Sequence, residues 1–188
     1  MSLPRLQTRF VEGARPYTGP ELRPHFLLSE LKLEGSTLAA FRGPCRVETG
    51  HLVDWEDRLA SDRIEAKEMV HFLGEFFGLT LREGVLLQRL LMSIMTDVVR
   101  ERGVEVRREG DDLFVGGRKL SVSIVTASPV SLLLHSGINI DPAGAPVKAI
   151  GLAELGIEPE GWIREVLSRF QKEWDGMDWA CVKVRPVM

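Results

Sequence analysis

The sequence predicts an α+β fold, in which helices pack against a mixed, mainly antiparallel sheet. Short β-type segments cluster in residues 104–140, where pairs of turn-forming residues separate them. Hydrophobic residues at helical spacing flank this region, in residues 62–103 before it and 163–174 after it. Because the strands are clustered and do not alternate with helices, a layered α+β domain is favoured over a parallel βαβ arrangement.

Composition narrows the class of protein. The 188 residues suit one domain over residues 1–188, and 44% hydrophobic with 27% charged residues favours neither a disordered chain nor a membrane protein. A net charge of −3 argues against a nucleic-acid partner. The start, Met1–Phe10, lacks the apolar core of a signal peptide, and two cysteines are too few for a disulfide framework. We therefore expect a cytoplasmic protein without a membrane partner.

The first elements are short. Two prolines precede an apolar stretch that predicts a helix over residues 20–31, which Gly35 ends. Residues 37–41 are typical of a short buried strand. The following Arg42-Gly43-Pro44-Cys45 constrains the backbone too much for regular pairing to continue, so we expect a functional loop there.

Two long helices are expected next. Asp62 with Glu65 has the spacing of a capping box, and apolar residues then recur at helical intervals up to Gly78. Thr80 with Glu83 has the same spacing and opens a second helix that stops at Gly103. The broad apolar stripe of this second helix favours a position across a sheet.

Residues 104–140 predict an antiparallel meander with turns at 110–111, 116–117 and 128–129. A final amphipathic helix follows over residues 163–174, with tryptophans as packing anchors, and residues 181–184 predict an edge strand.

Side-chain alternation in the meander predicts one polar sheet face. Lys119, Ser121 and Ser123 are expected on one face, opposite Leu120, Val122 and Ile124. In the next strand, the polar face is expected to carry Ser131, His135, Gly137 and Asn139. A hairpin about Ser128 would place Lys119 near Gly137 and Ser121 near His135. Two interpretations stay open, a ligand site with room above the glycine, or an ordinary solvated sheet face.

Two segments carry a family resemblance. Asp111-Asp112-Leu113-Phe114-Val115-Gly116-Gly117-Arg118-Lys119-Leu120-Ser121 and His135-Ser136-Gly137-Ile138-Asn139-Ile140 resemble successive strands of the catalytic domain of biotin and lipoate protein ligases. Ala40-Phe41-Arg42-Gly43-Pro44-Cys45 and Glu68-Met69-Val70-His71-Phe72 resemble an uncharacterised prokaryotic family, a domain of unknown function related in fold to these ligases. The resemblance implies a biotin/lipoate ligase-like, class II synthetase-like fold.

The resemblance also implies roles for individual residues. Lys119 would stabilise negative charge on an acyl carboxyl group or acyl-adenylate, and Asp112 would orient an acceptor, as the two catalytic residues. Arg42 would help bind the carboxylate or phosphate. The remaining substrate-binding candidates are Gly43, Cys45, Ser121, Ser123, His135, Gly137 and Asn139.

Departures from the ligase pattern leave the reaction open. The glycine- and arginine-rich motif that binds biotin and adenylate in biotin ligases is absent, so the cofactor stays unknown, with ATP and Mg²⁺ as the open possibility. We assign no metal ligand. Ala143 stands where related octanoyltransferases carry a nucleophilic cysteine. Cys45 could replace it as a nucleophile, or it is a small buried hydrophobe.

The prediction is a ligase or transferase acting on a small carboxylic acid, such as lipoate, octanoate, biotin or an analogue. Its partners would be that acid or its acyl-adenylate and an acceptor protein, and a homodimer is left open. The alternative is a non-catalytic ligand-binding or scaffold protein that retains the ligase fold. We further expect residues 48–57 to overhang the pocket, with Asp54 and Asp57 as polar contacts.

Overall fold

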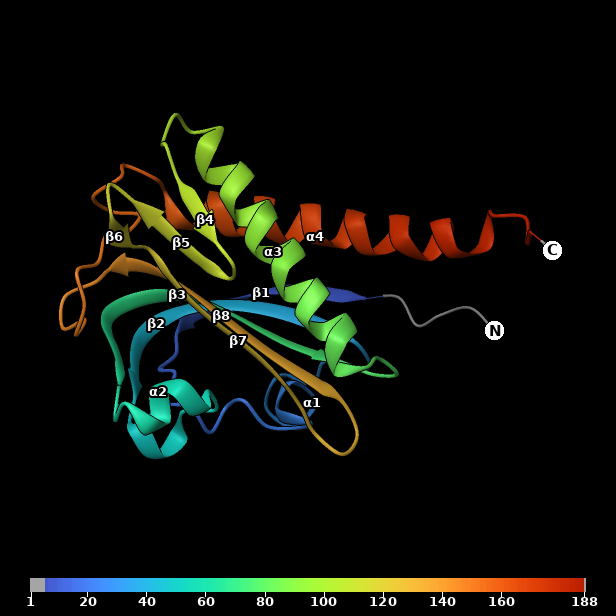
Figure 1. The fold of residues 1–188 in the computed structure, drawn as a ribbon, viewed down its shortest axis with the longest axis horizontal. Helices are drawn as coiled ribbons and strands as arrows, with labels where there is room; N and C mark the ends of the chain where they lie inside the picture. Colours follow the sequence, from blue (N-terminus) through green and yellow to red (C-terminus); the bar gives the residue numbers. More distant parts are fainter. Residues whose placement is uncertain (1–5, 188) are drawn as a thin grey trace.

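The computed structural model describes residues 6–187. Residues 1–5 and 188 lie outside this range. The prediction about a signal peptide rests on residues 1–10, so half of that segment lies outside the described residues. A five-stranded sheet, in the order β1-β2-β3-β8-β7, forms the centre of the fold (Figure 1). Of the neighbouring strands described in this sheet, β1 and β2 pair in parallel and the other three pairs are antiparallel, so the expected α+β fold with a mixed, mainly antiparallel sheet is confirmed. The elements are β1 (Gln7–Ala14), α1 (Phe26–Leu31), β2 (Thr37–Val47), a 3₁₀ turn (Thr49–His51), α2 (Trp55–Leu59), β3 (Ile64–Phe76), α3 (Leu81–Arg100), β4 (Arg107–Glu109), β5 (Asp112–Val115), β6 (Arg118–Lys119), β7 (Ser121–Ala127), β8 (Leu132–Asp141) and α4 (Pro159–Val182).

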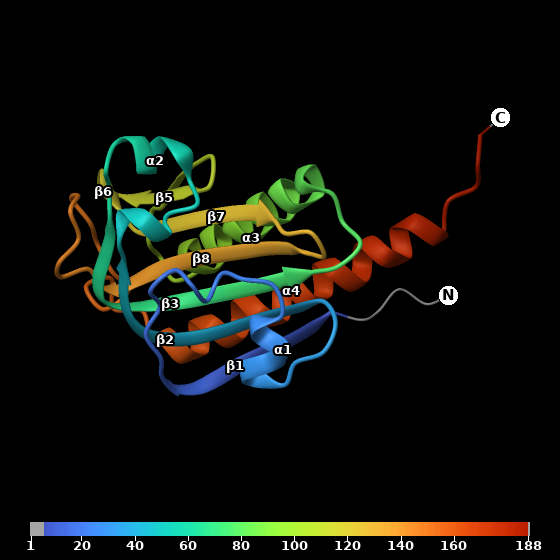
Figure 2. The ribbon, with the colours of Figure 1, turned by 90° about the horizontal axis from the view of Figure 1, so that it is seen from below.

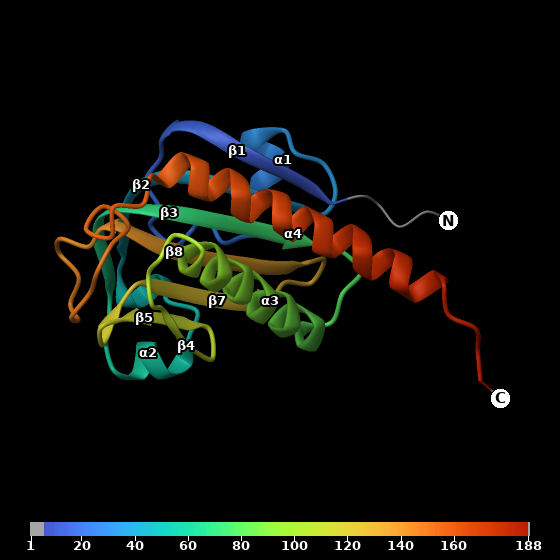
Figure 3. The same cartoon turned by 90° about the horizontal axis from the view of Figure 1, so that it is seen from above.

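The two faces of the large sheet are covered differently. Helices α3 and α4 lie across one face (Figure 3), and the main core fills the space between them and the strands. The short α1 and α2 lie on the other face (Figure 2), where a second apolar cluster includes Tyr17, Phe41 and Leu73. A small sheet of β4, β5 and β6 continues into β7 beside α2. Among the described residues, no helix has both the length and the apolar character needed to cross a bilayer.

The α3 helix forms as its sequence predicts. Thr80 and Glu83 make the expected capping box, which supplies hydrogen-bond partners to the first free backbone N–H groups. Leu87, Leu91 and Val98 are buried on the stripe that faces the sheet. Gly103 then adopts a left-handed backbone with φ 80°, a conformation that glycine favours after a helix.

The first long helix predicted from the sequence is wrong, because residues 64–76 form β3. This strand lies between β2 and β8, and it is buried on both faces. Val70 and Phe72 face the helices, whereas Met69 and Leu73 belong to the cluster on the opposite face. Such double burial removes the alternation that normally identifies a strand, and the continuous apolar run imitates helical spacing.

Three smaller expectations need correction, and one strand was missed. The helix predicted over residues 20–31 begins only at Phe26, because His25 adopts a left-handed backbone with φ 61°. The expected loop at 42–45 is part of β2, and the strand accommodates Pro44 at an irregularity in its register. The predicted edge strand at 181–184 is wrong: α4 continues to Val182, past the edge of the sheet where no strand is available for pairing (Figure 3). The parallel edge strand β1 was not predicted.

Candidate functional site

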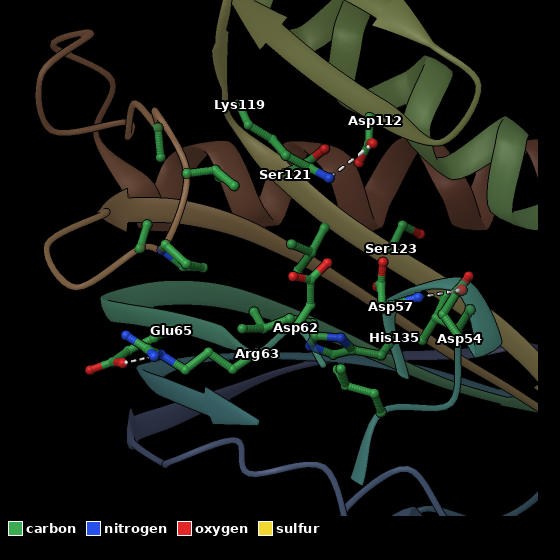
Figure 4. A pocket seen from close by; sticks show the side chains of 18 of the residues that line it. Asp54, Asp57, Asp62, Arg63, Glu65, Asp112, Lys119, Ser121, Ser123 and His135 are labelled. Carbon is green, nitrogen blue, oxygen red and sulfur yellow. Dashed lines mark hydrogen bonds and ion pairs between the residues drawn. The ribbon is translucent and has the colours of Figure 1, made fainter. Parts of the chain in front are cut away.

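A pocket of about 430 Å³ lies over the face of the sheet opposite α3 and α4, a size typical of small-molecule sites. Its floor comes from β7 and β8, one wall from the small sheet, and the facing wall from α2 and the start of β3 (Figure 4). The lining residues that carry polar or charged side chains are Asp54, Glu56, Asp57, Asp62, Arg63, Glu65, Asp111, Asp112, Lys119, Ser121, Ser123, His135 and Asn139.

Lys119 and Asp112 meet in this pocket. Lys119 Nζ lies 3.0 Å from Asp112 Oδ2, and the two side chains keep 32% and 33% of their surface exposed. Antiparallel pairing of β5 with β6 brings them together, since Lys119 pairs with Phe114, two residues beyond Asp112. The lysine is also fixed through its backbone N–H, which donates to the carbonyl of Lys148. The structure therefore places an ammonium group and a carboxylate side by side, accessible to a ligand.

The polar face expected around Lys119 is only partly formed. Leu120 packs in the core beneath the helices, whereas Val122 packs in the cluster on the pocket side, so these residues do not share a face. The reason is that the chain leaves the small sheet after Lys119 and enters the large sheet at Ser121, which interrupts the alternation. Ser121 Oγ accepts a hydrogen bond from the backbone N–H of Leu113 at 2.8 Å. That serine hydroxyl therefore holds the small sheet against β7.

The hairpin register also differs from the prediction. Val122, not Lys119, pairs with Gly137, and Ile124, not Ser121, pairs with His135. The turn spans residues 128–131 and is held by the Ser128 side chain, so its centre lies beyond the Ser128 position assumed from the sequence. This displacement shifts every predicted pair.

Gly137 and Asn139 lie on the expected strand, but their contacts differ from those expected. A methyl group added at Gly137 would overlap the end of the Met69 side chain and contact Val122, so protein atoms already fill the space expected for a ligand. Asn139 Nδ2 donates to the backbone carbonyls of Lys119, at 3.3 Å, and Ile150, at 3.1 Å. Asn139 thus holds in place the backbone that carries Lys119.

Arg42, Gly43 and Cys45 are not brought to the pocket. The Arg42 guanidinium donates two hydrogen bonds to Glu68, at 3.1 and 2.7 Å. Gly43 lies against the backbone of Arg15, which leaves no room for a side chain. Cys45 is 1% exposed in the cluster around Tyr17. Ser123 does line the pocket, and its hydroxyl lies 2.8 Å from that of Ser136.

Cys45 has the character of a core residue. Burial, with a smaller contribution from the charge of Glu21, raises the pKa of its thiol to about 12. We therefore expect a disulfide-exchange reagent at pH 8 to modify one thiol per native chain, the exposed Cys181, and two after unfolding. Cys181→Ser should lower the native count to zero, whereas Cys45→Ser should leave it at one. A native count of two would contradict this assignment.

The wall opposite Lys119 is acidic. Of the segment 48–57 that was expected to overhang the pocket, residues 52–54, 56 and 57 line it. Asp54 caps α2 by accepting the backbone N–H groups of Glu56 and Asp57. The pKa of Asp57 is raised, first by burial and then by the nearby charges of Asp54 and Asp62, although Lys119 opposes this shift. Asp62 belongs to the same wall, and the sequence missed it because it was assigned to a helix cap.

The family model for a domain of unknown function, DUF366, matches residues 6–185. The chain belongs to this family. An uncharacterised protein of Methanocaldococcus jannaschii is 32% identical to this DUF366 chain over 186 residues, which cover 95% of the chain and 84% of that protein. A protein of unknown function from Pyrococcus horikoshi has a solved structure that is 34% identical, with a TM-score of 0.93, covering 97% of this chain and 100% of the other.

Solved ligases share the fold of the DUF366 chain at much lower identity. The biotin protein ligase of Aquifex aeolicus, in complex with biotin and ATP, is 16% identical with a TM-score of 0.58, over 94% of this chain and 73% of that one. P. falciparum LipL1, in complex with lipoate, is 11% identical with a TM-score of 0.58, over 97% and 64%. The biotin/lipoate ligase-like fold and the relation to a domain of unknown function are thus both confirmed.

Acidic side chains outnumber cationic ones in the pocket lining. Seven aspartates and glutamates line it, against two cationic side chains. Both cations are ion-paired, Arg63 with Glu65 at 3.2 Å and Lys119 with Asp112 at 3.0 Å. Within residues 6–187, no group of three or more histidine, cysteine or carboxylate side chains is arranged to hold a metal ion.

Proposed function

We propose that this protein transfers the activated acyl group of a small carboxylic acid to an amine, with Lys119 and Asp112 at the reacting end of the pocket. The observation that carries the proposal is the accessible Lys119–Asp112 pair, 3.0 Å apart, beside a 430 Å³ pocket. The shared fold with proteins solved in complex with biotin or lipoate supports an acyl ligand. Lipoate, octanoate, biotin and their analogues are the candidate acids.

Each residue has a chemical role in this proposal. The amine nitrogen attacks the acyl carbonyl carbon, and the Lys119 ammonium stabilises the negative charge that develops on the carbonyl oxygen. The bond from that carbon to the leaving oxygen of an adenylate, or the leaving sulfur of a thioester, then breaks, and the leaving group departs with the electron pair. The Asp112 carboxylate orients the amine and accepts its proton. Asn139 holds the Lys119 backbone in position.

In this proposal the donor is activated before it binds, because carboxylates outnumber cations in the pocket lining and would repel a triphosphate, and because Cys45 is too buried to form a thioester. The expected cytoplasmic location and an acceptor protein that supplies the amine belong to the same proposal.

The test incubates the protein with octanoyl-, lipoyl- and biotinyl-adenylate, or octanoyl thioester, and the amine of N-acetyl-lysine amide. Mass spectrometry measures the amide product, and a second arm supplies the free acids with ATP and Mg²⁺ and measures pyrophosphate. We expect amide above the uncatalysed rate in the first arm and no acid-dependent pyrophosphate in the second. Pyrophosphate release would show that the donor need not be pre-activated.

A non-catalytic binding protein is the second candidate, and the acidic pocket together with the buried Cys45 favours it. In that case no donor yields amide, yet one of the acids raises the melting temperature of the protein, by an amount that depends on Lys119. That combination of results would overturn the transferase proposal.

A further inference from the structure

Two buried histidines connect the interior of the sheet with the pocket floor. His71 Nδ1 lies 3.1 Å from His135 Nε2, and His71 Nε2 lies 3.2 Å from the carbonyl oxygen of Gly43. The Tyr17 ring stacks on His135 with a centroid distance of 3.8 Å and an angle of 6° between the rings. Because Tyr17 and three strands fix both imidazoles, neither ring is free to rotate.

The Gly43 carbonyl determines where the protons lie. A carbonyl oxygen only accepts hydrogen bonds, so His71 Nε2 carries a proton. Burial lowers the pKa of His71 to about 4 and that of His135 well below its ordinary value, so both rings are neutral at pH 7. Neutral His71 therefore has a lone pair on Nδ1, which accepts the Nε2 proton of His135. The remaining nitrogen, His135 Nδ1, is left with a lone pair.

His135 Nδ1 faces the pocket without a protein partner. The side chain is 2% exposed and lines the pocket, where Figure 4 shows it on the same side as Asp57 and Asp62. Within residues 6–187, the polar side-chain atoms that are fully buried without a partner are the indole nitrogens of Trp162 and Trp174. His135 Nδ1 has no hydrogen-bond partner among these residues either, but it is not fully buried, so its lone pair is accessible from the pocket.

Two carboxylates face the same space. Asp57, on α2, and Asp62, before β3, line the pocket, and in the described part of the chain their carboxylate oxygens take part in no hydrogen bond or ion pair within 4 Å. Burial, and then the nearby charges of Asp54 and Asp62, raise the pKa of Asp57. His135 Nδ1, Asp57 and Asp62 thus present hydrogen-bond acceptors to the pocket, and no donor among the described residues satisfies them.

We propose that the His135 end of the pocket binds a positively charged group that donates N–H hydrogen bonds, with His135 Nδ1, Asp57 and Asp62 as its acceptors. His135 is then a specificity-determining residue, and His71 is a positioning residue that holds its proton on Nε2. The inference goes beyond the proposed function and does not depend on it, although Lys119 lines the same pocket.

The first measurement is the tautomer itself. Long-range ¹H–¹⁵N correlation spectra of protein with ¹⁵N-labelled histidine should show His71 and His135 neutral at pH 7, each protonated on Nε2. His71→Phe should give a mixture of His135 tautomers, whereas His51→Phe, an exposed control, should leave it unchanged. A wild-type His135 protonated on Nδ1 would overturn the inference, even if His71→Phe fails to fold.

The second measurement identifies the bound group, with methylammonium as the probe. Methylammonium should move the His135 Nδ1 resonance in a saturable manner, whereas tetramethylammonium, which has no N–H, and acetate, which is an anion, should not. Asp57→Asn or Asp62→Asn should weaken methylammonium binding about tenfold, the effect of one charge-assisted hydrogen bond. Asp97→Asn, exposed on α3, is the matched control.

An equal response to tetramethylammonium, or no response to methylammonium, would refute the cation site. These spectra involve no acyl donor, so they can fail while the transfer assay succeeds, and the reverse also holds.

Discussion

Lys119→Ala is expected to lower the rate of amide formation by about 10²–10³-fold, the usual loss when one group that stabilises a developing oxyanion is removed. Lys119 is the ammonium that lines the pocket, and its partner Asp112 is a carboxylate that cannot replace it. Single-turnover formation of the amide from the acyl-adenylate measures the chemical step, and binding of the unreacted acid measures ground-state affinity separately.

Lys148→Ala is the matched control for this experiment. Lys148 is exposed, its side chain is not part of the pocket lining, and its backbone carbonyl, which holds Lys119, is unchanged by the substitution. We expect its rate to stay within about twofold of the wild-type rate. Equal losses of rate in the two variants, or no loss in Lys119→Ala, would show that Lys119 has no specific role in the reaction.

Gly43→Ala is expected to reduce the free energy of unfolding by about 3 kcal/mol, the upper end of the usual cost of overpacking. The added methyl group would overlap the backbone carbonyl of Arg15, which cannot rotate away as a side chain can. The backbone around Arg15 is held against β2, because its N–H donates to the Arg42 carbonyl and that of Tyr17 donates to Pro44. Urea unfolding followed by circular dichroism gives the change.

Gly176→Ala serves as the comparison for Gly43→Ala. Gly176 lies within α4, and a methyl group there would meet no atom within 4 Å. Alanine is favoured over glycine in a helix, so the variant should gain up to about 1 kcal/mol. If Gly43→Ala were as stable as the wild type, the close approach of residue 15 to β2 would not be a fixed feature of the fold.

The parts of the fold that local chemistry determines were predictable from the sequence. The capping box at Thr80 and Glu83 and the glycine at 103 mark the limits of α3, and turn residues separate the strands between 107 and 141. These signals act within a few residues, so they do not depend on the rest of the chain.

Features set by distant partners were missed. β3 is buried on both faces because β2, β8 and two layers cover it, which no local pattern reports. β1 is recognisable as a strand only through its parallel pairing with β2. The hairpin register depends on the geometry of the turn at 128–131, which the alternation of side chains does not specify.

The candidate site was likewise predictable from the sequence only in part. Family resemblance identified Lys119 and Asp112, which the structure pairs, and the acidic composition of residues 48–57 indicated the overhanging wall. His71 and His135 are 64 residues apart in the sequence, and His71 was assigned to a helix. Their contact follows from the pairing of β3 with β8, so it could not be inferred before that pairing was known.

The position of β3 has a consequence for how the chain folds during synthesis. Its partner β2 precedes it closely, but β8 is made only after α3 and the small sheet, more than 50 residues later. Until then one edge of an apolar strand has no neighbour, and its helix-like spacing favours a transient non-native helix. We therefore expect a chain truncated after residue 103 to aggregate. Without β8, the free edge of β3 can pair with a strand of another molecule.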